Sequence, residues 1–148
     1  MYRKILLAYD GSETGQSALL ESRTIADWGK AEMCLVAVMP PPAAYVGAEG
    51  GIYDAGYEKQ ERERYDGVLQ DGLDKLREAG HQAKGTVLVG DPVTEIARYA
   101  RELGADLIVV GHRHLDSWAQ RWWRGSVSKA LIEHAPCNVL VAITQAPK

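Results

Sequence analysis

The 148-residue sequence has only two cysteines, Cys34 and Cys137, and each lies in or beside an apolar segment. A buried reduced thiol in such a segment acts as a small hydrophobic side chain, so we expect no disulfide. No apolar run approaches the length of a membrane span, and the first one stops at Asp10, too early for a secretory signal. These absences predict a soluble cytoplasmic protein with no membrane segment.

An excess of positive charge is also missing. The formal net charge is -3, with 17 Lys and Arg residues against 20 Asp and Glu residues. This balance provides no general attraction to nucleic acid or to anionic membranes, so we expect neither as a partner. With 46% hydrophobic residues, a chain of this length can bury one core without metal or disulfides. We therefore predict a single domain over residues 1–148.

Catalytic motifs are absent as well. The sequence has no G-x-S-x-G elbow, no Walker loop and no carboxylate pair whose spacing fixes it in space. His112 and His114 stand two residues apart without a nearby cysteine or carboxylate cluster, which does not match a metal site. We therefore predict no catalytic residue and no metal ligand set, and leave open only a slow hydrolysis of bound ATP.

What the sequence does contain is an alternation of apolar strands and amphipathic helices. Near-continuous apolar runs are typical of strands buried on both faces of a parallel sheet. Five such runs lie at residues 5–9, 34–38, 86–89, 107–110 and 139–143. Helical patterns lie between them at residues 13–29, 58–79, 92–103 and 126–134. This alternation predicts a doubly wound α/β domain.

Two segments carry clear local signals. Asp91 is a suitable N-cap for the helix at 92–103, and Pro92 suits its first position. By contrast, the prolines and glycines of residues 39–57 exclude a regular element. Long loops inside a compact domain are usually functional, so we predict that residues 39–57 form a flap beside a site.

Doubly wound sheets bind ligands beyond the carboxyl ends of their strands, where the strand order reverses. One segment that leaves such an end opens at Gly111 and closes with Gly125-Ser126 at a helix start. Glycine backbone and a helix N-terminus together favour a phosphate. This segment also holds Arg113, Arg121, Arg124, His112, His114, Trp118, Trp122 and Trp123.

Three stretches resemble the universal stress protein family. They are "KILLAYDGSETGQSAL", "GDPVTEIARYARELGADLIVVG" and "GSVSKALIEHAPCNVLVA", and the likeness covers nearly the whole chain except the flap. The resemblance implies a three-layer, Rossmann-like fold of the adenine nucleotide alpha hydrolase type, with a five-stranded parallel sheet in the order 3-2-1-4-5. In that order Asp10 and the segment after Val110 would face each other at the switch point.

The resemblance also implies a nucleotide site. Members of the family that bind ATP use a G-x2-G-x9-G-[ST] phosphate loop. Gly111 and Gly125-Ser126 match its ends, but His114 replaces the second glycine and the interval is one residue longer. A Cβ costs about 1 kcal/mol where a positive φ is required, which bidentate arginines could offset. The implied cofactor is therefore ATP or another adenine nucleotide, with Mg²⁺ only as its companion.

The implied contact residues come from four segments. They are Ala8, Tyr9, Asp10, Gly11, Val38, Gly111, Arg113, His114, Arg124, Gly125, Ser126, Val127 and Ser128. Asp10 would accept a hydrogen bond from a ribose hydroxyl, but it equally suits a turn that caps a helix. Ser126 and Ser128 would donate to phosphate, but a serine at a helix start equally serves as an N-cap.

The Arg- and Trp-rich residues 112–124 leave other functions open. Their tryptophans suit local core packing, stacking on a base, or a partner surface, where Trp and Arg are enriched. The leading prediction is a stress-response binding and signalling protein with an adenine-nucleotide cleft. The alternatives are an interaction module that docks a partner protein through residues 112–124 without nucleotide, and a weak ATPase.

The last apolar segment predicts self-association. In the implied order the fifth strand lies at a sheet edge, and "NVLVAI" at residues 138–143 has no Pro, Lys or Glu to protect it. Pairing across a twofold axis removes the bare edge and closes a homodimer, an association that the family resemblance also implies. We predict a homodimer whose contact includes Val139 and Val141.

Overall fold

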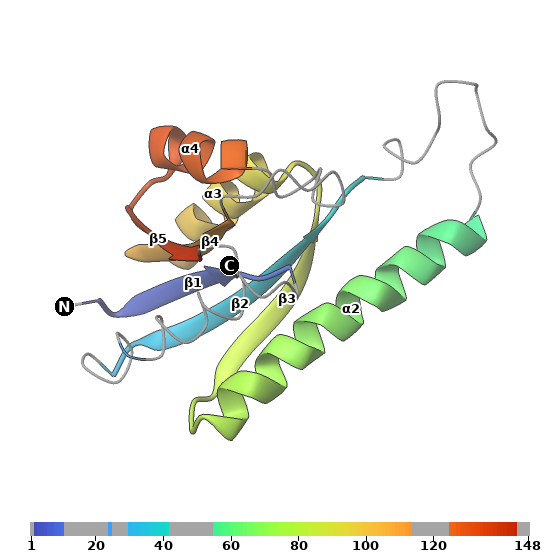
Figure 1. Ribbon diagram of the computed structural model, residues 1–148, viewed down its shortest axis with the longest axis horizontal. Coiled ribbons are helices and arrows are strands. Elements are labelled where there is room, and N and C mark those ends of the chain that lie inside the picture. Colours follow the sequence, from blue (N-terminus) through green and yellow to red (C-terminus); the bar gives the residue numbers. More distant parts are fainter. Residues whose placement is uncertain (1, 11–23, 25–29, 42–54, 114–124, 145–148) are drawn as a thin grey trace.

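The sheet has five parallel strands and is covered by helices on both faces (Figure 1). The computed structural model describes residues 2–10, 24, 30–41, 55–113 and 125–144. The strands are β1 (Lys4–Ala8), β2 (Glu32–Met39), β3 (Ala83–Val89), β4 (Leu107–Arg113) and β5 (Asn138–Thr144). The helices are α2 (Ala55–Glu78), α3 (Pro92–Leu103) and α4 (Gly125–His134). The strand order is β3-β2-β1-β4-β5, so the predicted fold class and order are confirmed.

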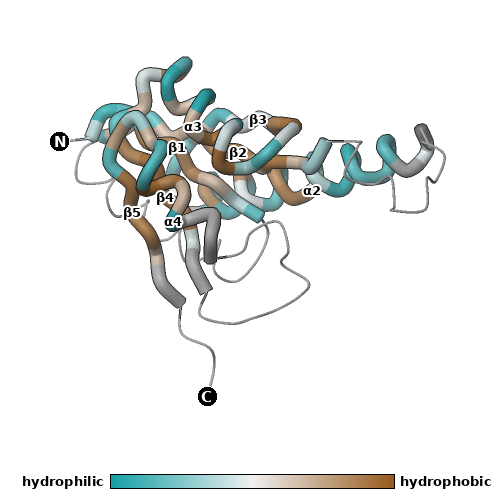
Figure 2. Tube along the Cα trace, turned by 90° about the horizontal axis from the view of Figure 1, so that it is seen from above, coloured by the Kyte–Doolittle hydropathy of each residue, from teal (hydrophilic) through white to brown (hydrophobic). Residues whose placement is uncertain are grey.

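Alternate residues of each central strand enter two separate apolar layers. On one face Leu6, Val36 and Ile108 are buried with residues of α3 and α4. On the other face Ile5 and Leu35 are buried with Leu76 of α2. Figure 2 shows hydrophobic residues concentrated in the strands and hydrophilic ones along much of the helices. Burial on both faces explains why these strands read as continuous apolar runs.

Most element boundaries lie within three residues of their predicted positions, and the flap needs a correction. Met39 is the last residue of β2, and residues 55–57 already belong to α2. The irregular connection is therefore shorter than predicted, and residues 42–54 lie outside the described part of the chain. Of the helix predicted at 13–29, only Thr24 is described, and it is helical.

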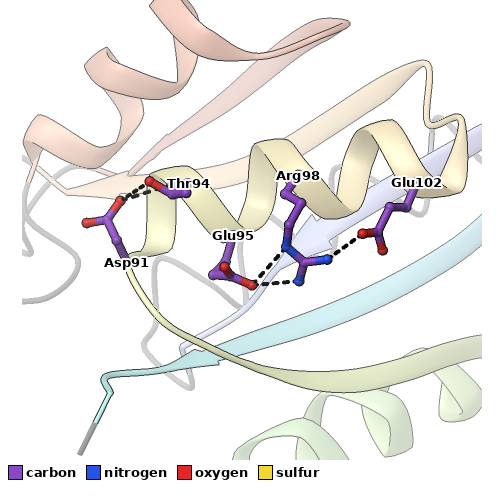
Figure 3. A network of polar contacts seen from close by, with 5 residues as sticks. All are labelled: Asp91, Thr94, Glu95, Arg98 and Glu102. Carbon is purple, nitrogen blue, oxygen red and sulfur yellow. Dashed lines mark hydrogen bonds and ion pairs between the residues drawn. The ribbon is translucent and has the colours of Figure 1, made fainter. Parts of the chain in front are cut away.

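Helix α3 begins as its sequence predicts (Figure 3). The Asp91 carboxylate accepts hydrogen bonds from the Thr94 backbone N–H and from the Thr94 hydroxyl, both at 3.0 Å. Along the outer face, Arg98 lies between Glu95 and Glu102 and donates to each at 2.6 Å. Because Asp91 caps the helix, the N-terminus of α3 already holds a negative charge from its own chain.

A second carboxylate joins the start of the chain to the turn between α3 and β4. Asp106 accepts hydrogen bonds from the backbone N–H groups of Arg3, at 2.8 Å, and Lys4, at 3.0 Å. The Lys4 ammonium donates to the Leu103 carbonyl at 3.0 Å. Burial raises the pKa of Asp106, but the backbone donors outweigh burial, and the pKa is lowered.

Replacement of Asp106 with alanine should lower the free energy of unfolding at pH 7 by about 2 kcal/mol, because two N–H groups lose a charged acceptor. Since the native pKa lies below the unfolded value, this contribution is present above about pH 4 and is lost as the pH falls through the native pKa. Urea unfolding between pH 7 and pH 3 measures it. Asp66→Ala, at an exposed ion pair with Arg62, is the control and should change little. If the free energy of unfolding of wild type exceeded that of Asp106→Ala by the same amount at every pH in this range, the ionised Asp106 carboxylate would not be the source of the stabilisation.

Candidate functional site

The central strand β1 ends before both of its neighbours. The last residue pairs of β1 match Ala8 with Val36 of β2 and Leu7 with Val109 of β4. Both neighbours continue for about three residues past this point, roughly 10 Å at the usual rise of a strand. We call this offset between the end of β1 and the ends of its neighbours the step. It lies where the strand order reverses, with β2 and β3 on one side and β4 and β5 on the other. Asp10 lies two residues past the end of β1, at this step, which is the predicted switch point.

Backbone groups of β2 face the step. The Tyr9 N–H donates to the Val36 carbonyl at 2.9 Å, and the Gly90 N–H donates to the Met39 carbonyl at 2.9 Å. Successive residues of β2 therefore direct their backbone groups toward β1 and β3 in turn. By this alternation Val38 directs its N–H and C=O toward the β1 side, beyond the end of that strand. A neighbouring donor and acceptor there can pair with the edge of a flat heterocycle.

The first predicted contact residues contribute little through their side chains. Ala8 and Val38 are buried in the layer between the sheet and helices α3 and α4. Tyr9 turns the other way and is buried against α2. Any contact that these three residues make at the step must therefore come from their backbone. Gly11 lies outside the described residues.

Tyr9 has polar partners on α2 that the sequence analysis missed. Its hydroxyl donates to the Asp71 carboxylate at 2.9 Å, and the Lys75 ammonium donates to the same carboxylate at 2.9 Å. Burial, followed by the hydrogen bond to Asp71, raises the pKa of Tyr9. Hydrogen bonds from Lys75 and then Tyr9 lower the pKa of Asp71. The one sequence feature that pointed to these partners was the pair of opposite charges at i and i+4, Asp71 and Lys75, on either side of Gly72.

The predicted phosphate loop is wrong at its start, because its first three residues belong to strand β4. Gly111, His112 and Arg113 were expected in an irregular segment after Val110, but they continue the strand. They pair in parallel with Ala142, Ile143 and Thr144 of β5. Because β5 offers an equally long partner, the ladder extends past the last apolar residue of β4. Of the remaining predicted residues in this segment, His114 and Arg124 lie outside the described part of the chain, as do its tryptophans.

The first turn of α4 holds the remaining predicted residues. Gly125 is the first helical residue, and Ser126, Val127 and Ser128 follow it. Ser126 therefore lies inside the helix rather than at the N-cap position before it. The first N–H groups of a helix have no partner within it, and α4 has no acidic residue in its first turn. A helix N-terminus whose first turn has no acidic residue favours an anion nearby.

A hollow of about 500 Å³ lies away from these residues, at the carboxyl ends of β2 and β3 on the α2 side. It is lined by Met39, Glu58, Lys59, Arg62, Glu63 and Val89. Of the predicted contact residues that the structure describes, none lines it. Within the described ranges, no three His, Cys, Asp or Glu side chains gather closely enough to hold a metal ion. Nor does any helix described there have the length and apolar character to cross a membrane.

The topology and the step at β1 define a doubly wound α/β domain whose candidate site lies at the switch point. The model of the universal stress protein family matches residues 1–142, and the chain belongs to this family. A Staphylococcus epidermidis protein whose name places it among the universal stress proteins is 33% identical over 146 residues, which cover 97% of this chain and 86% of that protein.

Solved structures agree with this membership. A universal stress protein family structure from Burkholderia pseudomallei is 28% identical, with a TM-score of 0.74 over 95% of both chains. An Arabidopsis thaliana family member with AMP bound is 20% identical, with a TM-score of 0.71 over 97% of this chain and 93% of that one. An Archaeoglobus fulgidus member in complex with dAMP is 21% identical, with a TM-score of 0.67 over 95% and 97% of the two chains. At such identities the last two likenesses show the fold alone.

Proposed function

We propose that this chain is a cytoplasmic stress-response binding and signalling protein that holds an adenine nucleotide at the carboxyl ends of β1 and β4. The observation that carries the proposal is the step left by β1. The step leaves the backbone of Val38 and Asp10, two residues past β1, at the carboxyl ends of the central strands, and α4 follows the carboxyl end of β4 along the chain. The AMP and dAMP complexes of family members support the class of ligand.

Each part of a nucleotide has a partner in this proposal. The adenine edge presents an amino donor beside ring nitrogen acceptors, which suits the N–H and C=O of Val38. Asp10 accepts a hydrogen bond from a ribose hydroxyl. The phosphates meet the first turn of α4, from Gly125 to Ser128, with Arg113 and Arg124 as further partners. Mg²⁺ enters only with the nucleotide, as a counterion of its phosphates.

Purified protein exchanged into ammonium acetate and then denatured should release ATP, ADP, AMP or cyclic AMP, detected by mass spectrometry. The protein stripped of nucleotide should gain thermal stability with millimolar ATP, because a ligand that binds only the folded state stabilises it. No nucleotide and no thermal shift would instead favour the interaction module that docks a partner through residues 112–124. Slow phosphate release from bound ATP would favour the weak ATPase.

Gly125→Val should weaken ATP binding about 100-fold, because a branched side chain at the start of α4 blocks the approach of phosphate to the backbone. Trp122→Ala should change the Kd by less than about threefold, since stacking is not the proposed source of affinity. Calorimetry on folded variants measures both. Gly67→Val is the matched control, because a Cβ on Gly67 of α2 meets no atom within 4 Å. The reverse ranking of Gly125 and Trp122 would indicate an aromatic docking surface.

We also propose that two copies associate through β5. The two edges of the sheet differ in a way that supports this choice. The β3 edge carries exposed Lys84 and Gly85, and Lys84 lies 3.6 Å from Glu32. The β5 edge carries no charged residue from Asn138 to Thr144. Charged edge strands discourage pairing, so β5 is the edge available to a second copy.

Val141→Lys should convert the dimer to monomer in sedimentation equilibrium, because a charge on β5 opposes pairing with another strand. Val89→Lys places the same charge on the opposite edge strand, at a residue that is 37% exposed, and should leave the mass unchanged. Val141 also packs partly against the core, so circular dichroism must show that the variant is folded. A folded Val141→Lys protein that remains dimeric would exclude this interface.

A further inference from the structure

Tyr9 is placed between the candidate site and helix α2. It follows β1 directly and precedes Asp10, and its side chain is only 1% exposed. Its hydroxyl donates to the Asp71 carboxylate at 2.9 Å and accepts from the Lys75 ammonium at 3.4 Å. Both hydrogen-bonding roles of the phenol are therefore filled by side chains from a single helix.

This polar contact lies at the solvent side of an apolar layer. The Tyr9 ring is buried with residues such as Leu7 and Leu35, whereas its hydroxyl reaches Asp71 and Lys75, whose side chains are 52% and 37% exposed. Gly72 lets the helix approach the ring, because a Cβ there would lie 2.8 Å from Tyr9 Cδ1 and 2.7 Å from Leu35 Cδ2. Helix α2 and the Tyr9 ring thus fit together in one arrangement.

The backbone of the same residue is held as well. The Tyr9 N–H donates to the Val36 carbonyl at 2.9 Å, one pair beyond the end of β1. The contacts of the Tyr9 side chain and of the Tyr9 amide thus hold the end of β1, from which the chain continues to Asp10. The N–H and C=O of Val38 are directed toward this same side of β2. We propose that Tyr9, through Asp71 and Lys75, is a positioning residue that sets Asp10 and the end of β1 for nucleotide binding. This inference rests on the proposed function.

The test compares Tyr9→Phe, which keeps the ring but removes the hydroxyl, with wild type. Calorimetry with ATP and AMP as probes should show a Kd raised about fivefold to tenfold at a temperature where both proteins are folded. In amide hydrogen exchange measured by NMR, the N–H of residue 9 should exchange about fivefold or more faster. Asp74→Ala is the matched control, because Asp74 pairs with Arg77 on the outer side of the same helix.

Two further variants separate positioning from stability. Asp71→Asn keeps an acceptor for the hydroxyl and should retain the wild-type Kd within about twofold, whereas Asp71→Ala should lose as much as Tyr9→Phe. The double variant Tyr9→Phe, Asp71→Ala should lose no more than either single variant, because both remove one interaction. A purely structural role would lower the unfolding temperature in these variants and leave Kd unchanged.

The outcomes distinguish the two proposals. If wild type binds neither probe, the proposed function fails, and this inference fails with it. If wild type binds and Tyr9→Phe binds equally tightly, only the positioning role is overturned. A raised Kd together with faster exchange at residue 9, absent from Asp74→Ala, supports it.

Discussion

The candidate site exists because the central strand β1 ends before both of its neighbours. Its residues 5–8 are buried, and two parallel neighbours leave it no edge to solvent. Because β2 and β4 both continue past it, backbone groups of β2 that face the β1 side lie beyond the last pair of β1, whose residue Ala8 is close to Asp10 in the chain. A ligand at a switch point needs such a place, since along the rest of an inner strand the two neighbouring strands occupy the backbone groups.

The strands and their class were predictable because their cause is local. A strand buried on both faces must be apolar at nearly every residue, as "CLVAV" is at Cys34–Val38, and this holds whichever strand lies beside it. The order of the strands is not local, and it came from the family resemblance. The capped start of α3 was predictable for the same local reason as the strands, since Asp91 and Pro92 act within a single turn.

The end of β4 and the partners of Tyr9 were not predictable in this way. Gly111, His112 and Arg113 have no apolar pattern, and they are strand residues because β5 lies alongside them. Asp71 and Lys75 have the spacing of any exposed helical ion pair, and only the packing of α2 brings them to Tyr9, which lies 62 and 66 positions earlier. Both features arise from contacts between segments distant in the sequence, and both lie beside the candidate site.

The three described helices differ at their N-termini in a way that bears on where an anion would bind. Helix α2 has Glu58 in its first turn, and α3 has the Asp91 cap and Glu95. Helix α4 has no acidic residue in its first turn and begins with glycine. A carboxylate at a helix N-terminus partly neutralises the positive end of the dipole and competes for the free N–H groups. Of these three termini, α4 is therefore the one whose own first turn opposes a phosphate least, and it follows the carboxyl end of β4 along the chain.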